Sequence, residues 1–176
     1  MAQEAKRRGA DRVMLITSAD RMAPYGVEAF LVESSEDMAQ KATELFEEAD
    51  ITIMSAAVSD IIPVKKFNYK LKKKDDILSK LSFKLNQNIL QLLAQKKKPG
   101  QILVGFAAES GLDEEDVLAK FKSKKVDLIV ANDISRQDIG LASDYNEVML
   151  LSEGNRHKIL KRAKKEIIAR RIWDHI

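Results

Sequence analysis

The sequence predicts an α/β domain built on a mainly parallel, doubly wound sheet. An apolar strand at Val27 to Val32, a helical segment and a second apolar strand at Ile51 to Met54 follow one another directly. Such a unit crosses over with a right hand, so its two strands are parallel neighbours or near neighbours. Two further apolar strands, at Ile102 to Ala107 and Val126 to Ala131, each follow a predicted helix. This alternation predicts the fold class, and 176 residues suffice for one domain, residues 1–176.

The helix inside this first unit has clear start signals. Ser34 or Ser35 can cap it, and Glu36 and Asp37 place negative charge in its first turn, where the helix dipole favours it. Apolar residues then recur at helical spacing, and these are Met38, Ala42, Leu45, Phe46 and Ala49. One face of this helix is therefore expected to lie in the core.

The other elements are expected on either side of this unit. Before it lie the end of a helix at Ala2 to Gly9 and a buried strand at Arg12 to Thr17, and the strand at Val27 to Val32 is expected to be buried as well. After it come a half-exposed strand or hairpin between Pro63 and Leu85, a helix at Asn88 to Gln95, and a helix from Asp113 to Lys125 whose Val117, Leu118 and Phe121 face inward. The chain closes with a strand at Glu147 to Leu151 and a basic amphipathic helix, whose apolar stripe consists of Ile159, Leu160, Ala163, Ile167 and Ile172. Gly105, inside a predicted strand, indicates a bulge or a close backbone approach.

Composition excludes several classes of function. The chain has no cysteine, so it has no disulfide, no thiolate nucleophile and no thiolate metal site. Its two histidines, His157 and His175, have no metal-ligand spacing. The net charge of +3 and an aromatic content of 6% do not favour a nucleic-acid binder. No apolar stretch is long enough for a membrane span and the N-terminus is too polar for a secretory signal, so the cytoplasm is expected.

The most informative stretch follows the strand at Ile51 to Met54. The small residues Ser55, Ala56 and Ala57 come next, and Asp60 follows shortly after them. Ligands of open α/β sheets bind beyond the carboxyl ends of the strands, and small residues let a ligand approach the backbone. A lysine-rich segment that includes Lys70 comes after the acid and is a candidate cover for an anionic ligand. A solvated loop with an acid at its base is the alternative, at even weight.

Two further groups are candidates for the same edge of the sheet. Asn132 and Asp133 follow the strand at Val126 to Ala131. Lys120 and Lys124 lie one turn apart on one predicted helix face, for which a charged solvent face is the simpler reading. The chain contains no GxGxxG, GxxxxGK[ST] or GxSxG motif. The strand and phosphate-binding turn that normally open a doubly wound fold are expected to lie before Met1.

Five motifs, in this order and spacing, resemble the phosphopantothenoylcysteine synthetase domain of bacterial coenzyme A biosynthesis. They are SAAVSD at 55–60, KLKK at 70–73, VGFAAES at 104–110, VDLIVANDIS at 126–135 and DYNEV at 144–148. The resemblance runs from about Gly9 to the C-terminus. It implies a Rossmann-like fold with a flap or dimerisation arm at 63–85, and it implies that the first strand and Gly-rich loop of the domain are missing here.

The resemblance also implies a chemistry. The carboxylate of 4'-phosphopantothenate is activated by a nucleoside triphosphate, CTP in most bacteria, with Mg²⁺, and the amine of cysteine then displaces CMP. Whether this chain uses CTP or ATP stays open. Lys70 matches the catalytic lysine of the flap. The resemblance assigns nucleotide binding to Ser55, Ala56, Asp60, Lys70, Asn88, Ile89, Phe106, Lys120 and Lys124, substrate binding to Ala57, Asn132 and Asp133, and no metal ligand to the protein.

Partners and departures complete the expectations. The family is dimeric, and in many bacteria its domain follows a flavin-dependent decarboxylase domain, so a homodimer and such a fusion or partner are expected. No nucleic acid or membrane is expected. Where the family has Asn-Pro-Asp-Ile, this chain has Asn86, Gln87, Asn88 and Ile89, so an acid is replaced by Asn88. A non-catalytic nucleotide-binding or dimerisation module of the same fold is the alternative function.

Overall fold

A mixed sheet forms the centre of the computed structural model, which describes residues 1–18, 22–65, 67, 69–70, 72, 81–109, 111, 125–136, 138–139, 143–152 and 156–176. Its strand order within these residues is β3 (Ile51–Met54), β6 (Ile102–Glu109), β7 (Leu128–Asp133), β8 (Tyr145–Ser152) and β9 (Arg156–Lys164). The first three strands are parallel, and β8 and β9 extend the sheet antiparallel.

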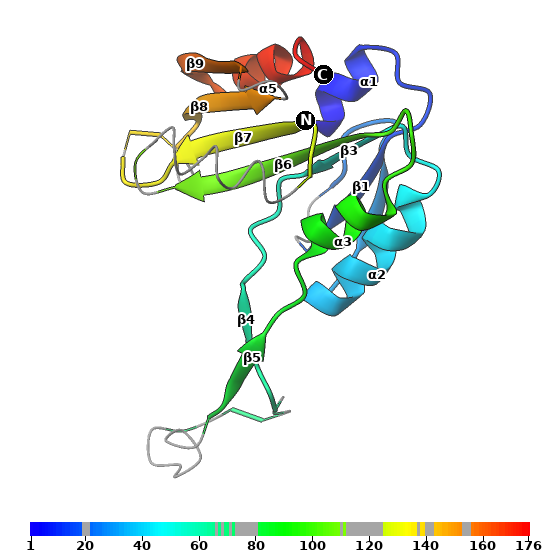
Figure 1. Ribbon diagram of the computed structural model, residues 1–176, viewed down its shortest axis with the longest axis vertical. Helices are drawn as coiled ribbons and strands as arrows, with labels where there is room; N and C mark the ends of the chain where they lie inside the picture. Colours follow the sequence, from blue (N-terminus) through cyan, green and yellow to red (C-terminus); the bar gives the residue numbers. More distant parts are fainter. Residues whose placement is uncertain are drawn as a thin grey trace.

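Helices cover both faces of this sheet, as Figure 1 shows. Helices α2 (Ser35–Phe46) and α3 (Ile89–Lys96) lie on one face, and α1 (Ala2–Arg7) and α5 (Lys165–Trp173) lie on the other. The α/β, doubly wound fold expected from the sequence is confirmed. The N-terminus and the C-terminus lie near each other beside α1 and α5 (Figure 1).

The core follows the two-residue period of the central strands. Alternate residues of β6 and β7 face the two layers, so Leu103 and Ile129 pack with α2 and α3, whereas Val104 and Val130 pack toward α5. All four side chains are essentially buried. Both faces of these strands are therefore apolar, as expected of parallel strands covered by helices on both sides.

Helix α2 begins as its sequence predicts. Ser34 is the N-cap, its side chain accepts a hydrogen bond from the Asp37 backbone N–H, and the Asp37 carboxylate accepts one from the Ser34 backbone N–H. This capping box satisfies two donors that would otherwise lack intrahelical partners. Met38, Ala42, Leu45 and Phe46 are buried, which confirms the predicted core face for these four residues. Ala49, the fifth, lies beyond the end of the helix and is only half-buried, because the helix ends one turn earlier than expected.

Gly105 lies where α3 comes closest to the sheet. A Cβ atom at this position would be 2.5 Å from Cδ2 of Leu90, a distance that real side chains do not tolerate. The parallel register with β7 runs unbroken from Val104 to Glu109. Of the two readings of this glycine, the close approach is therefore the correct one.

The two N-terminal strands are less buried than the sequence suggests. Strands β1 (Met14–Thr17) and β2 (Glu28–Leu31) pair in parallel as a separate two-stranded sheet, with β1 half-buried and β2 mostly exposed. The expectation of buried strands is wrong here, because within the described residues β1 has no hydrogen-bonded neighbour on the side of β3. Arg12, just before β1, forms ion pairs with Glu28 at the start of β2 and with Glu48 just after α2.

The C-terminal helix is shorter than expected. Ile159, Leu160 and Ala163, assigned to that helix by their spacing, belong to strand β9, and only Lys165–Trp173 is helical. Leu160 is 4% exposed and the adjacent Ile159 is 52% exposed, which is the alternation of a strand. The helix prediction is wrong for this segment because pairing with β8 overrides a local pattern that also fits a helix.

A hairpin arm leaves the body of the molecule after β3. Its strands β4 (Ile61–Pro63) and β5 (Phe83–Leu85) pair antiparallel and extend away from the sheet (Figure 1). The expected half-exposed hairpin is thus present at its base, and much of the predicted flap beyond it lies outside the described residues. The predicted helix from Asp113, with Lys120 and Lys124, also lies outside them. No helix in the described part of the chain is long and apolar enough to cross a bilayer.

Candidate functional site

The side chain of Asn86 joins the segment after β3 to the start of α3. Its Nδ2 donates to the Ser59 carbonyl at 2.8 Å, and its backbone N–H donates to the Asp60 carbonyl at 2.8 Å. Its Oδ1 accepts from the Gln87 backbone N–H at 2.9 Å and from Ser35 Oγ at 3.3 Å. Asn86 therefore fixes the backbone beside Asp60 against the N-termini of α2 and α3.

Asn88 and Ile89 begin α3 just beyond this junction. The Asn88 Oδ1 accepts a hydrogen bond from the Gln91 backbone N–H at 3.0 Å, and Ile89 is 3% exposed. Asn is as good an N-cap as Asp, so the departure expected at this position still gives a capped helix start. Because the Asn88 oxygen is engaged and Ile89 is in the core, a ligand here would meet mainly their backbone.

Ser55, Ala56 and Ala57 form an exposed run at the carboxyl end of β3. Val58 then packs against the core, and its backbone N–H donates to the Ala56 carbonyl at 3.2 Å, which turns the chain. Asp60 follows at the base of the arm with an exposed side chain. The small side chains leave the backbone accessible, as expected of a segment that a ligand approaches closely.

Phe106 and Asn132 lie on the same face of the sheet, further along its carboxyl edge. Phe106 pairs with Val130 and Asn132 pairs with Ala108, so the two side chains are neighbours on the face that packs toward α5. Phe106 is half-buried against that core cluster. Asp133, one residue beyond Asn132, belongs to the opposite face.

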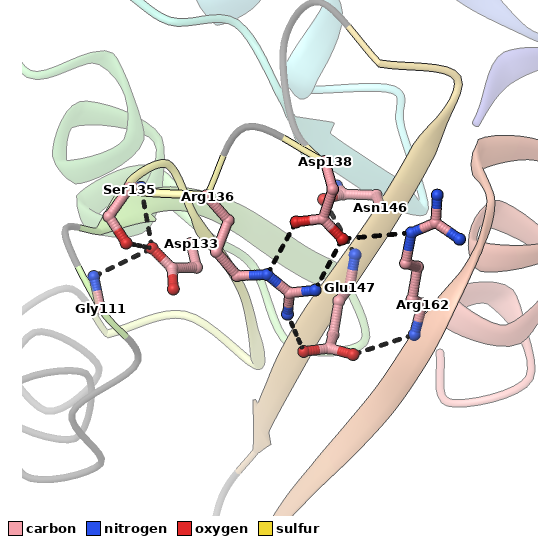
Figure 2. A network of polar contacts seen from close by, with 8 residues as sticks. All are labelled: Gly111, Asp133, Ser135, Arg136, Asp138, Asn146, Glu147 and Arg162. Atoms are coloured by element: carbon pink, nitrogen blue, oxygen red, sulfur yellow. Dashed lines mark hydrogen bonds and ion pairs between the residues drawn. The ribbon is translucent and has the colours of Figure 1, made fainter.

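Asp133 is the acceptor in the first of two neighbouring groups of polar contacts (Figure 2). Its Oδ1 accepts hydrogen bonds from the Gly111 backbone N–H, the Ser135 backbone N–H and Ser135 Oγ, at 3.0, 2.9 and 2.6 Å. Chiefly the Ser135 hydroxyl and then the two backbone donors hold the pKa of Asp133 below its usual range. These bonds stabilise the ionised form.

The second group of contacts centres on Arg136, the residue after Ser135. Its guanidinium makes a bidentate contact with Asp138 at 3.0 and 2.8 Å and contacts Glu147 Oε1 at 2.6 Å (Figure 2). The other Glu147 oxygen accepts from the Arg162 backbone N–H at 3.0 Å, and the Arg162 guanidinium lies 4.1 Å from the centre of the Tyr145 ring. The Arg136 hydrogen bonds hold the pKa of Asp138 below its usual range.

Lys70, the predicted catalytic lysine, lies in the arm beyond β4 with an exposed side chain. Within the described residues Asp60 and Lys70 form no ion pair with each other. The structure places the Asp60 backbone against Asn86, two residues before the N-cap Asn88. Sequence reasoning passed over the roles of Asn86 and Glu147. An acid within the otherwise apolar run of β8 was the available signal for Glu147, since a charged residue there needs a partner.

Residues 1–176 match the family described as the DNA/pantothenate metabolism flavoprotein C-terminal domain. The chain belongs to this family. Family members include the bifunctional coenzyme A biosynthesis protein CoaBC of Bacillus subtilis, 36% identical over 170 residues, which are 95% of this chain and 41% of that protein. CoaBC of Methanocaldococcus jannaschii is 34% identical over 162 residues, 90% of this chain and 38% of that protein. The chain thus spans about two fifths of the length of these relatives.

Solved structures of the family agree with the fold. The crystal structure of the C-terminal domain of CoaBC has a TM-score of 0.79 at 27% identity and covers 99% of this chain and 76% of its own. A Cab2 variant in complex with phosphopantothenate-cysteine has a TM-score of 0.62 at 14% identity, over 85% of this chain and 53% of its own. The resemblance identified from the five motifs is confirmed at the level of the family and the fold.

Proposed function

We propose that this domain is the ligase part of a coenzyme A biosynthesis enzyme, which joins 4'-phosphopantothenate to cysteine. The observation that supports this most is the junction at Asn86, which binds the carbonyls of Ser59 and Asp60, just after an exposed run of small residues, beside the N-terminus of α3. Backbone N–H groups at a helix start and an accessible backbone beside them suit a nucleotide. The names of the family's relatives supply the pathway.

The proposed reaction has two steps. A carboxylate oxygen of 4'-phosphopantothenate attacks the α-phosphorus of CTP, pyrophosphate leaves, and an acyl-cytidylate forms. The amine of cysteine then attacks the acyl carbon and CMP leaves with the electron pair of the broken bond. Charge develops around the α-phosphate in the first step, and a cation placed there lowers the barrier. Mg²⁺ is proposed to enter bound to the triphosphate, as is common for this ion.

Each candidate residue has a role in this proposal. Lys70 stabilises the charge at the α-phosphate. Asp60, the backbone of Ser55 and Ala56, and the start of α3 at Asn88 and Ile89 bind the nucleotide, together with Phe106, Lys120 and Lys124. Ala57 and Asn132 contact the acid substrate, and Asp133 is treated in the next subsection.

The arm is proposed to complete the site in a homodimer. Ile61, Val64, Phe83 and Leu85 are each at least half exposed on it, which is unusual for large apolar side chains that lie so close together. A second copy of the chain is the proposed partner, and its approach would cover these side chains. A flavin-dependent decarboxylase domain, fused or separate, is proposed as the neighbour in the pathway.

Pyrophosphate release tests the function. A full-length ligase carrying this domain should release pyrophosphate from CTP with Mg²⁺ only when 4'-phosphopantothenate is present, and ATP in place of CTP tests the choice of nucleotide. The alternative, a non-catalytic nucleotide-binding or dimerisation module, has some support because Asp60 and Lys70 do not meet within the described residues. CTP binding that raises the melting temperature without any pyrophosphate release would favour it.

A further inference from the structure

One oxygen atom connects the chain segments that leave two neighbouring strands. Asp133 ends β7, and its Oδ1 accepts from Gly111, just beyond β6, and twice from Ser135, just beyond β7 (Figure 2). The carboxyl ends of β6 and β7 form one edge of the sheet, where ligands of α/β folds bind. These three hydrogen bonds to Asp133 Oδ1, called here the Asp133 clamp, fix how the backbone at Gly111 and the backbone at Ser135 lie relative to each other at that edge.

The segment from β6 needs such a restraint. Gly111 has φ of +94°, in the left-handed region, and a Cβ atom there would meet nothing within 4 Å. The glycine is thus required by the backbone conformation and not by lack of space. Among the described residues, the hydrogen bond from its N–H to Asp133 holds the Gly111 backbone, and the Ile134 N–H, which donates to the Glu109 carbonyl at 2.8 Å, joins the same two segments closer to the strands.

The other end of the Asp133 clamp is anchored to β8 and β9. Arg136 follows Ser135 directly and binds Glu147, whose side chain is 24% exposed. The β8–β9 register shifts between Asn146 and Val148, and there the second Glu147 oxygen accepts from the Arg162 N–H. Arg136, in the segment after β7, is therefore held by Glu147 of β8, which is itself bound to Arg162 of β9.

The strand alternation separates Asp133 from its neighbour Asn132. Asn132 shares a face with Val130 and lies near Phe106, whereas Asp133 shares a face with Ala131, which packs in the other core cluster. A ligand beside Phe106 would meet Asn132 first. The Asp133 Oδ1 that could have bound a ligand already accepts three hydrogen bonds.

We propose that Asp133 is a positioning residue, which holds the backbone beyond β6 and β7 in place through Oδ1 and acts by geometry, not by charge or ligand contact. The role in catalysis rests on the proposed ligase function, whereas the clamp itself does not. An asparagine offers an Oδ1 acceptor in the same place without the charge. Asp133→Asn should therefore keep the clamp, and Asp133→Ala should remove it.

Two measurements test this proposal. In the chain itself, hydrogen exchange of the Gly111 amide should change little in Asp133→Asn and accelerate about tenfold or more in Asp133→Ala, as expected for the loss of a hydrogen bond to a charged group. In a full-length ligase, Asp133→Ala should raise KM for CTP or lower kcat/KM by about 10²-fold, the scale of a displacement near 1 Å. Asp133→Asn should stay within about threefold of wild type, since only the charge assistance is lost. Asp11→Asn, at an exposed acid far from this edge, is the matched control.

Each contrary result is decisive. If Asp133→Asn keeps the Gly111 amide protected but loses as much activity as Asp133→Ala, the carboxylate acts by its charge and the positioning role is wrong. If Asp133→Ala leaves the exchange of Gly111 unchanged, the clamp itself is wrong. If the wild-type ligase releases no pyrophosphate, the proposed function fails while the exchange experiment still decides the clamp.

Discussion

Asp60 and Asp133 both follow parallel strands near the carboxyl edge of the sheet, yet the structure uses them in opposite ways. The Asp133 carboxylate is committed to three hydrogen bonds within the fold. At Asp60 the backbone carbonyl is held by Asn86, and the carboxylate makes no hydrogen bond or ion pair within the described residues. An acid whose backbone is fixed and whose carboxylate makes no contact in the described fold is available to a ligand, whereas Oδ1 of Asp133 is occupied by three hydrogen bonds that hold the backbone of two chain segments.

The largest loss of activity is expected from substitution of Lys70, whose side chain is exposed and makes no hydrogen bond or ion pair within the described residues. Lys70→Ala should lower kcat of the full-length ligase by about 10²- to 10³-fold, the usual effect of removing a group that stabilises transition-state charge. Its melting temperature should match that of wild type. Lys84→Ala, at an exposed lysine of β5, is the control and should retain normal kcat. Normal turnover by Lys70→Ala would remove Lys70 from the mechanism.

A smaller effect is expected at Asp60. Asp60→Asn should weaken CTP binding by about tenfold, because a hydrogen bond to a charged group is lost or weakened. Unfolding in urea should be unchanged, since the carboxylate has no partner in the described fold. The control is Asp50→Asn, at the amino end of β3 and so at the opposite edge of the sheet. Loss of stability without loss of CTP affinity would reverse the contrast with Asp133.

Glu147 should behave as a purely structural residue. Glu147→Ala leaves the Arg162 N–H without its acceptor and removes one of the two carboxylates that bind Arg136, so it should lower the free energy of unfolding by about 1–3 kcal/mol. Urea denaturation measures this effect. Glu47→Ala, at an exposed acid just after the end of α2, should change it by less than about 0.5 kcal/mol. Equal losses in both variants would mean that the network in Figure 2 adds no stability.

Acid should lower the stability of the fold by protonating Asp133 and Asp138. The pKa values of Asp133 and Asp138 are lowered in the folded protein, so their contribution to stability is complete above the unfolded value of about 3.9 and is lost as pH falls through the folded values. Stability measured from pH 6 to pH 2 should fall below about pH 4. Asp133→Asn should flatten this fall. A variant curve parallel to that of wild type would show that Asp133 is not linked to folding.

The smallest effect is expected at Asn88. Asn88→Asp keeps the N-cap and adds negative charge at the start of α3, where it should stabilise by about 0.3–1 kcal/mol. Asn88→Ala should instead cost about 1 kcal/mol. Thermal unfolding measures both effects: the melting temperature should rise in Asn88→Asp and fall in Asn88→Ala. Destabilisation by Asn88→Asp would indicate that other negative charge lies near the helix start.

The sequence was informative where local signals agree with the tertiary structure. The capping box at Ser34 and Asp37 and the apolar spacing of α2 both predict the same helix, and it is present. For β9 they disagree, because the spacing of Ile159, Leu160 and Ala163 fits a helix while the free edge of β8 offers strand pairing. Tertiary pairing decides such cases, and one sequence does not record it.

The same distinction applies to the site. The small residues before Asp60 and the five motifs are contiguous in sequence, so they identify the edge of β3 and the family. The two Ser135 bonds of the Asp133 clamp are local, whereas its Gly111 bond and the contacts of Glu147 join residues 11 to 22 positions apart. Hydrogen bonds between such distant residues depend on the register of β6, β7, β8 and β9. That register could not be derived before the strand order was known.

Gly105 gives the interior of the protein control over its surface. Leu90, the second residue of α3, packs on this glycine, and the start of that helix lies beside Asn86, which fixes the Asp60 backbone. A methyl group at position 105 would overlap Cδ2 of Leu90, so this side chain would have to move. A substitution in the middle of β6 can therefore change how the start of α3 packs while every residue at the carboxyl edge of the sheet remains unaltered.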